Sequence, residues 1–402
     1  PITERYIEYI SYSLIEPRYT PDECRSLQKS YEYGLKIKVR LNQEEPVEES
    51  ILLCHIPKMI GGGEFVINGI DRLIVTQINR PPGIDFEEES YSDGSKFYSC
   101  SIIPERGSWV NFTISKKGVL HARIDNRIKV PATVLLKVLF GDQCTVSDLL
   151  RDIYDTQIVP LSSPTSIARI TGRIIVIPII NQETGEIYIR AGETITESLA
   201  EDLVASGLEE IEILEYPEDD LILNTILEDE TTDYNSALRL LYSKFRPGNP
   251  FNEERARDLI EDRFNNPNRY NLGRIGRFRI NRKFGLDIPE DVFTLQKEDF
   301  IAMIKYLTGL RKNKPGYELD DIDHLGNRRV KTIKDQLESV LRGGLIRLRH
   351  YVMDKLSKYK GIETDEPITP SLFFKSQAVD SAVKYFFQRG ELSQIVDQTN
   401  PL

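Results

Sequence analysis

The sequence has few of the residues that build disulfide frameworks and metal sites. Its 402 residues include only 4 cysteines and 4 histidines. The cysteines lie far apart and form no CxxC pair, which disfavours a disulfide framework or a zinc site and favours a reducing compartment. The histidines show neither HxxxH nor HExxH spacing. We therefore expect no metal site in this chain.

Long hydrophobic runs are also missing. No apolar stretch approaches the roughly 20 residues that a membrane-spanning helix needs, so we expect no membrane span. The longest apolar stretch, 174–180, has the length of a strand and contains Pro178. The first residues, from Pro1 to Glu4, do not resemble a secretory signal peptide, and they lack an initiator methionine. We expect a processed or trimmed start and a protein that is not secreted.

The charge argues against a free-standing nucleic-acid binder, whose affinity would come from a basic surface. The net charge is −11, with ordinary fractions of hydrophobic (40%) and charged (29%) residues. The charge is nevertheless uneven, because 264–286 is basic without any acid and 209–220 holds seven acids without a base. A protein that touches DNA along one face would have this pattern, and so would ordinary charge clustering. The length predicts two to three domains, each with its own core.

Hydrophobic periodicity predicts both strands and helices. Strands are expected at 31–39, 97–103, 109–114 and 120–124, and on both sides of an Asn68-Gly69 hairpin turn within 64–75. Helices are expected at 131–139, 194–206, 234–264 with a break at 246–250, 297–312, 331–358 and 375–388. The acidic stretch 209–233 is expected to be an exposed loop and helix edge.

The most informative segment is the decapeptide DDIDHLGNRR, from Asp320 to Arg329. It gathers carboxylates and guanidiniums around one glycine. Arginine forks match phosphates and base edges, and aspartates accept hydrogen bonds from base amino groups. The alternative is a solvated turn whose charges pair with each other.

This decapeptide resembles a signature of the β subunit of bacterial-type multisubunit RNA polymerase. Further segments resemble that family in the same order: 56–59 (IPKM), 65–77 (FVINGIDRLIVTQ), 79–83 (NRPPG), 103–109 (IPERGSW), 123–125 with 129–133, 246–250 (RPGNP), 269–282 and 386–402 (FFQRGELSQIVDQTNPL). The resemblance covers about the amino-terminal third of a bacterial β subunit. It implies an α+β fold, in which a mixed α/β protrusion domain is interrupted by an inserted α+β lobe.

The resemblance also implies domain boundaries. The protrusion would comprise 1–70 and 331–392, the lobe 71–330, and the start of the fork and rifamycin-pocket region 393–402. The helices within 331–392 would pack onto strands from the first 70 residues. Residues 145–220 are too few for the large lobe insertion of some bacteria.

The family pattern implies a pocket that captures an unpaired guanine of the non-template DNA strand. By motif position it would be formed by Arg80, Trp109, Asp125, Ile322, Asp323 and Arg328. Trp109, the only tryptophan, would stack on a neighbouring base. Two alternatives remain, namely that Trp109 is a core residue of the lobe and that Arg80 forms a surface ion pair.

A second implied site is the wall of the RNA path and rifamycin pocket. It would draw on Gln77, Leu392, Ser393, Gln394, Asp397 and Gln398, with Ile395 and Val396 between them. This sequence departs from the family pattern at Glu391, Ile395 and Val396, which puts rifamycin sensitivity in doubt. Basic side chains could also meet phosphates or form a solvated or intersubunit face: Arg277, Arg279, Arg282 and Lys283.

The resemblance implies that this chain carries no catalytic residue. The catalytic Mg²⁺ would be held by the β′ partner, and this chain would need no cofactor of its own. Expected partners are the remainder of β, β′, the α dimer, a σ-type factor, both DNA strands and nascent RNA, in the cytoplasm (nucleoid) or plastid stroma. A split subunit and a fragment of a longer chain both fit the sequence. The alternative function is a non-catalytic module that binds transcription factors.

Overall fold

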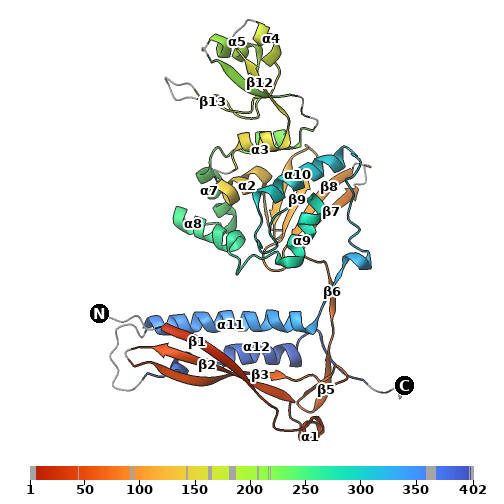
Figure 1. Ribbon diagram of the computed structural model, residues 1–402, viewed down its shortest axis with the longest axis vertical. Coiled ribbons are helices and arrows are strands. Elements are labelled where there is room, and N and C mark those ends of the chain that lie inside the picture. Colours follow the sequence, from red (N-terminus) through yellow and green to blue (C-terminus); the bar gives the residue numbers. More distant parts are fainter. Residues whose placement is uncertain are drawn as a thin grey trace. The chain divides into compact units, whose positions relative to one another are not determined.

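The computed structural model divides into two compact units, 1–79 with 329–402 and 80–328 (Figure 1). It describes the chain except for residues 1–5, 44, 91–93, 95, 142–143, 162–164, 181–186, 206–207, 216, 218, 359–367, 398 and 400–402. The second unit interrupts the first along the chain.

The first unit extends to residue 79, nine residues beyond the expected boundary after residue 70. Strand β5 (Ile70–Ile74) pairs with β17 (Ser393–Ile395), and β6 (Gln77–Asn79) pairs with β16 (Arg329–Lys331). These backbone hydrogen bonds hold 71–79 in the first unit, which resumes at Arg329 rather than at residue 331.

The first unit is an antiparallel sheet covered by helices. Its sheet consists of β1 (Tyr6–Ile15), β2 (Glu32–Asn42) and β3 (Val47–Pro57), and α1 (Pro21–Ser26) follows β1. Helices α11 (Ile333–Lys358) and α12 (Gln377–Gln388) contribute Leu348, Val383 and Phe387 to a core that also contains Leu53 and Phe65. The predicted packing of these helices onto the first strands is therefore confirmed.

A tight hairpin joins β4 (Phe65–Ile67) to β5. Its turn residues Asn68 and Gly69 have φ values of 51° and 82°. Asparagine and glycine tolerate this left-handed region, which two-residue hairpin turns require. The predicted Asn-Gly turn is confirmed.

The second unit contains a five-stranded antiparallel sheet in the order β11-β10-β9-β8-β7. Its strands are β7 (Gly83–Ser90), β8 (Lys96–Ile103), β9 (Val110–Ile114), β10 (Leu120–Ile124) and β11 (Ile128–Pro131). The surrounding helices are α2 (Ala132–Phe140), α3 (Val146–Ile153), α6 (Leu221–Glu228), α7 (Tyr234–Phe245), α8 (Glu253–Ile260), α9 (Gly273–Phe284) and α10 (Lys297–Arg311).

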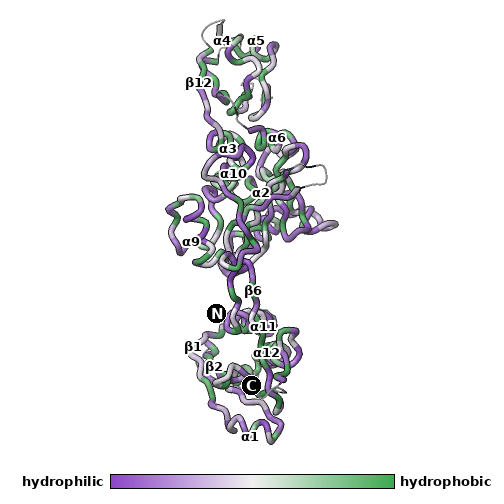
Figure 2. The backbone as a smooth tube through the Cα atoms, turned by 90° about the vertical axis from the view of Figure 1, so that its right-hand side faces the viewer, coloured by the Kyte–Doolittle hydropathy of each residue, from purple (hydrophilic) through white to green (hydrophobic). Residues whose placement is uncertain are grey.

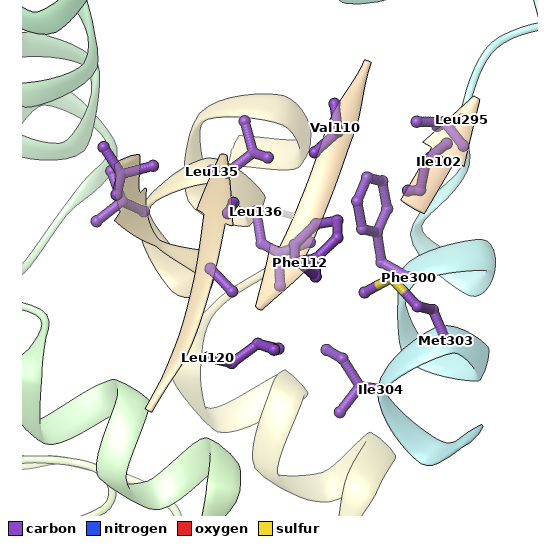
Figure 3. Packing of buried hydrophobic residues seen from close by; sticks show 14 of the residues in the cluster. Ile102, Val110, Phe112, Leu120, Leu135, Leu136, Leu295, Phe300, Met303 and Ile304 are labelled. Atoms are coloured by element: carbon purple, nitrogen blue, oxygen red, sulfur yellow. The ribbon is translucent and has the colours of Figure 1, made fainter. Parts of the chain in front are cut away.

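The core of this unit forms between the sheet and its helices. Phe112 of β9 and Phe300 of α10 point toward one another, with ring centroids 5.9 Å apart (Figure 3). Leu135 of α2 and Met303 of α10 belong to the same buried cluster. Alternation along β9 places Val110, Phe112 and Ile114 on the buried face, as the sequence pattern predicts.

Within the second unit, residues 156–214 form a small substructure with a core of its own. Strands β12 (Thr156–Pro160) and β15 (Glu210–Leu214) pair beside α4 (Thr165–Ile170) and α5 (Glu197–Ala205), and β13 (Ile179–Ile180) pairs with β14 (Ile187–Ile189). Hydrophobic and hydrophilic stretches alternate through these elements (Figure 2). The prediction that 209–233 is exposed loop and helix edge was wrong for 210–214, which form β15 with Ile211 and Ile213 buried, whereas α6 does lie within this stretch.

Antiparallel sheets with helices on their faces confirm the predicted α+β class. Within the described parts of the chain, none of the helices combines the length and apolar character that a membrane crossing requires.

Candidate nucleic-acid interface

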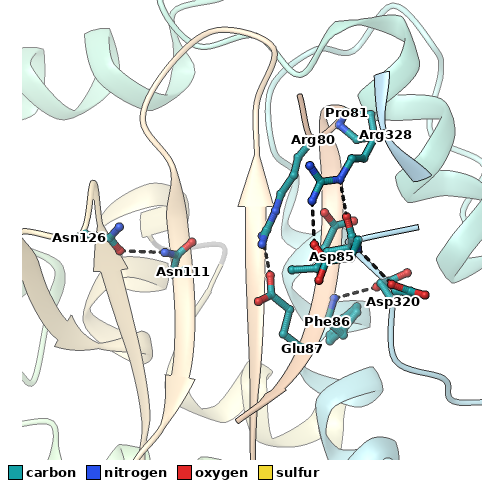
Figure 4. Close-up of polar contacts among 12 residues, drawn as sticks. Arg80, Pro81, Asp85, Phe86, Glu87, Asn111, Asn126, Asp320 and Arg328 are labelled. Carbon is teal, nitrogen blue, oxygen red and sulfur yellow. Dashed lines mark hydrogen bonds and ion pairs between the residues drawn. The ribbon is translucent and has the colours of Figure 1, made fainter. Parts of the chain in front are cut away.

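The decapeptide is anchored to the outer edge of β7. The Phe86 N–H donates to the Asp320 carboxylate over 2.7 Å, and the Asp320 N–H donates to the Phe86 carbonyl oxygen over 3.0 Å (Figure 4). The Lys283 ammonium pairs with the same carboxylate and lies 4.7 Å from the Phe86 ring centroid. Asp320 therefore serves as the structural attachment of the segment to the sheet.

The rest of the decapeptide is folded by its own hydrogen bonds. The Asp321 carboxylate accepts from the N–H groups of Asp323 and His324, both over 3.1 Å. The Asn327 side chain donates to the Asp321 carbonyl oxygen over 2.8 Å. A short 3-10 turn, Leu325–Asn327, completes the loop. These contacts give the loop a defined shape although most of it is exposed.

Arg328 joins the two ends of this loop. Its Nε donates to the Ile322 carbonyl oxygen over 3.0 Å, and its Nη2 pairs with Asp323 over 2.7 Å (Figure 4). The Asp323 side chain is 84% exposed. The charges thus do pair with each other, as the alternative interpretation of the decapeptide expected. An exposed pair of this kind stabilises by only about 0–1 kcal/mol, so a ligand could displace it at little cost.

Arg80 pairs with Glu87 of β7 over 2.6 Å, and both side chains are partly buried. The expected alternative of an ion pair for Arg80 is therefore what the structure contains. Glu87 directly follows Phe86, whose backbone holds the decapeptide, so this pair ties Arg80 to the same strand. Sequence reasoning missed Glu87, and nothing in the spacing of these residues indicated the contact.

Trp109 and Asp125 are joined at the end of β9 and β10. The Trp109 N–H donates to the Asp125 carboxylate over 3.0 Å, and the Asp125 N–H donates to the Trp109 carbonyl oxygen over 2.9 Å. Trp109 is 43% exposed, so it is not a core residue. Just before it, Gly107 has φ 129°, and a Cβ there would lie 2.7 Å from a ring carbon of Tyr270. Only glycine fits this close approach.

The sheet register brings these residues to one end of the sheet. Gly83 pairs with Ile103, and Val110 pairs with Ile102 and Ile124. Arg80, Trp109 and Asp125 lie just beyond these positions. The decapeptide runs toward the same end, because Asp320 bonds Phe86 whereas Arg329 pairs with Asn79. Strand β8 separates β9 from the edge strand β7. Because neighbouring strands are about 4.8 Å apart, the start of β9, next to Trp109, lies about 10 Å from β7.

Three of the four basic side chains that could meet phosphates have internal partners in the structure. Arg277 is 0% exposed and binds Asp299 through two hydrogen bonds of 2.7 and 3.0 Å. Arg279 donates to the carbonyl oxygens of Pro81 and Pro82 and pairs with buried Asp85, whose pKa burial raises. Lys283 holds Asp320, as described above. Arg282 is exposed.

Two of these basic residues hold the segments that carry the candidate site residues. Arg279 holds the loop that carries Arg80, and Lys283 holds the decapeptide, both from helix α9. Their charge suggested DNA contact, but the acids that neutralise them lie far away in the sequence. No local signal could have revealed that pairing.

The second predicted site lies on β6, β17 and the residues after them. The Leu392 carbonyl oxygen accepts a hydrogen bond from the Val75 N–H. The Ser393 hydroxyl donates to the Phe387 carbonyl oxygen and accepts from the Arg72 guanidinium. Gln394, Ile395 and Asp397 are exposed, whereas Gln77 and Val396 are half-buried. Ser393 is thus a connector whose hydroxyl already has partners. Gln398 lies outside the described residues.

The geometry defines an α+β unit that presents an ordered polar loop and an exposed tryptophan at one sheet end. A comparison with known protein families identifies the family to which this unit is similar. The family model "RNA polymerase Rpb2, domain 2" matches residues 80–158 and 205–331, together just over half of the chain. Most of the small substructure lies in the gap between these two matched ranges.

Curated relatives match nearly the whole chain. It is 42% identical over 402 residues to the DNA-directed RNA polymerase subunit beta of Rhodopirellula baltica, and 34% identical over 404 residues to those of Protochlamydia amoebophila and Chlamydia pneumoniae. Each match covers 98% of this chain and 32% of the relative.

The chain belongs to the β (Rpb2) family of multisubunit RNA polymerases, of which it represents an amino-terminal part. It spans about a third of the length of the curated relatives that it matches. The alternative of a separate module that only binds transcription factors is not favoured by these matches.

Proposed function

We propose that this chain forms a wall of the main channel of a DNA-directed RNA polymerase and holds the non-template strand of the open DNA. The observation that carries the proposal is the exposed side chain of Trp109, whose backbone N–H is held by Asp125 at the sheet end toward which the decapeptide runs. An indole in this position offers a stacking face that accepts any base.

Trp109 and Asp323 would divide the work between stacking and base recognition. Stacking on an aromatic side chain stabilises by roughly 1–3 kcal/mol per base. The Asp323 carboxylate can accept from the N–H groups of a guanine, and the Arg328 fork can donate to its acceptors. Because the Arg328–Asp323 pair is exposed, a base could replace each partner's contact at little cost. Arg80 and Ile322 would complete the pocket.

The chemistry of polymerisation would belong to the assembled enzyme, a nucleotidyltransferase. The described residues contain no group of three or more His, Cys, Asp or Glu that could hold a metal ion. We propose that Mg²⁺ is bound by the β′ partner, and that the α dimer, a σ-type factor and the remainder of β complete the complex. Such a complex would act where its template lies, in the nucleoid or the plastid stroma.

The second site would line the path of nascent RNA. Exposed Gln394 and Asp397 could offer polar contacts to RNA or to an antibiotic, with Gln77 and Gln398 beside them by motif position. Ile395 presents an exposed aliphatic side chain where the family usually has an aromatic one. This difference favours weak rifamycin binding.

The pocket can be tested by crosslinking in a polymerase assembled with this chain. A bubble template would carry a photoreactive guanine, unpaired, on the non-template strand. Trp109→Ala and Asp323→Ala should each reduce the crosslink to this chain, whereas Phe278→Ala, which removes another exposed aromatic ring of the same unit, should not. A crosslink that is absent from the wild type, or that is as strong in both variants as in the wild type, would refute the pocket.

A further inference from the structure

The hairpin that presents Trp109 is held from outside the sheet by one arginine. Arg263 donates from Nε to the Ser108 hydroxyl over 2.8 Å, and its Nη2 pairs with the Asp125 carboxylate. Ser108 directly precedes Trp109, and Asp125 faces Trp109 across the sheet. One guanidinium therefore binds a side chain on each of the two strand ends that meet at Trp109.

The Asp125 carboxylate has two different tasks in this arrangement. Oδ1 accepts from the Trp109 N–H, whereas Oδ2 accepts from Arg263. Asp125 also has φ 49°, a left-handed conformation that aspartate tolerates but does not prefer. Without Arg263 the carboxylate would be free to rotate away from Trp109. The guanidinium therefore orients the Asp125 carboxylate, which accepts the hydrogen bond from the Trp109 backbone N–H.

Arg263 is itself held in place. Its guanidinium carbon lies 4.6 Å from the ring centroid of Phe245, at the end of α7. Its backbone lies in a π-helical turn, Glu261–Asn265, that extends α8. Such turns are rare and occur frequently at functional sites. A planar guanidinium can stack on a ring and donate in two directions at once, which a lysine ammonium cannot do.

We propose that Arg263 is a positioning residue of the nucleic-acid site, which orders the Trp109 indole as a stacking platform through Ser108 and Asp125. It does not touch DNA itself. Its effect on DNA rests on the function proposed above, whereas its effect on Trp109 does not depend on that function.

The single tryptophan makes the positioning directly measurable. In the 402-residue chain, all tryptophan fluorescence comes from Trp109. We expect Arg263→Gln to shift the emission maximum and to raise the acrylamide quenching constant, because the hairpin loses its external support. Arg263→Lys should restore the charge but not the simultaneous contacts with Ser108 and Asp125. Its emission maximum and quenching constant should therefore be closer to those of Arg263→Gln than to those of the wild type.

Arg269→Gln is the matched control. Arg269 pairs with Asp262 over 2.8 Å, so its loss removes an ion pair from the same π-helical turn without touching Ser108 or Asp125. Its Trp109 quenching should equal that of the wild type. Ser108→Ala, which removes the Arg263 contact with Ser108, provides a milder test if Arg263→Gln does not fold. Unchanged Trp109 quenching in folded Arg263→Gln, or in Ser108→Ala should the former not fold, overturns the proposal.

A second readout separates this proposal from the proposed function. In the assembled polymerase, Arg263→Gln should weaken binding of a bubble template with an unpaired non-template guanine by roughly tenfold, comparable to losing one base stack. If Trp109→Ala itself leaves that binding unchanged, the proposed DNA function fails while altered quenching still supports positioning. If Trp109→Ala weakens binding but Arg263→Gln does not, the positioning role fails.

Discussion

Arg277 and Asp299 form a fully buried ion pair between helices α9 and α10. The guanidinium also donates to the carbonyl oxygens of Val292 and Thr294, over 2.8 and 2.6 Å. Every arm of the arginine is thus occupied inside the second unit. The pair joins α9, which carries Arg279 and Lys283, to the core beneath the sheet.

Removal of one partner of this pair should be strongly destabilising. Arg277→Met leaves the Asp299 carboxylate buried without its cation, which typically costs about 3–5 kcal/mol. The free energy of unfolding of the second unit would be measured from its unfolding transition in chemical denaturant. Arg282→Met, on the same helix but exposed, should change it by less than about 0.5 kcal/mol. Equal stabilities of the two variants would contradict this account.

The same variant should depend on pH in a defined direction. Burial raises the pKa of Asp299, and Arg277 opposes that rise. In Arg277→Met the folded-state pKa should rise further above that of the unfolded chain. The folded state then binds the proton more tightly, so stability should fall as pH rises through the window between the two pKa values. Unfolding measured on both sides of that window checks the sign, and a gain in stability with rising pH would contradict it.

Lys283 should control the order of the decapeptide rather than contact DNA. Lys283→Met keeps an unbranched chain near Phe86 and Tyr306 but loses the ion pair with Asp320. We expect faster amide hydrogen exchange across 320–328, measured by mass spectrometry. Lys297→Met, which removes an ion pair with Asp152 elsewhere in the same unit, is the control. Equal exchange at 320–328 in the two variants would show that Lys283 does not anchor the loop.

The cysteines should be unreactive in the folded chain. All four are free and buried, and burial raises the pKa of Cys54 to about 12 and that of Cys144 to about 11. At pH 8 a thiol of pKa 12 is thiolate in only about one molecule in ten thousand, and the thiolate is the reactive form. Mass analysis after brief iodoacetamide treatment should find little alkylation before unfolding and four alkylated cysteines after it. Rapid labelling of Cys54 in the native chain would contradict the burial.

Local sequence patterns determined much of the fold. Strand β8 lies at Lys96–Ile103 and β10 at Leu120–Ile124, where alternation predicts them, and α12 lies at Gln377–Gln388, inside the predicted helix. Elements without a clean period were not predicted, among them β1 with its mostly exposed residues. The acidic stretch was misassigned because alternating Ile211 and Ile213 are buried between glutamates.

The sequence by itself determined the family, the α+β class and the residue types at the candidate site, because these depend on motifs and short periods. Only the tertiary structure decided which charges are available to a ligand. Asp320 and Lys283 are occupied in anchoring the decapeptide, Arg277 is buried, and Asp323 is exposed. Those pairings join residues up to 234 positions apart, as between Phe86 and Asp320. Such contacts form through the packing of the sheet and helices, and local propensity carries no information about them.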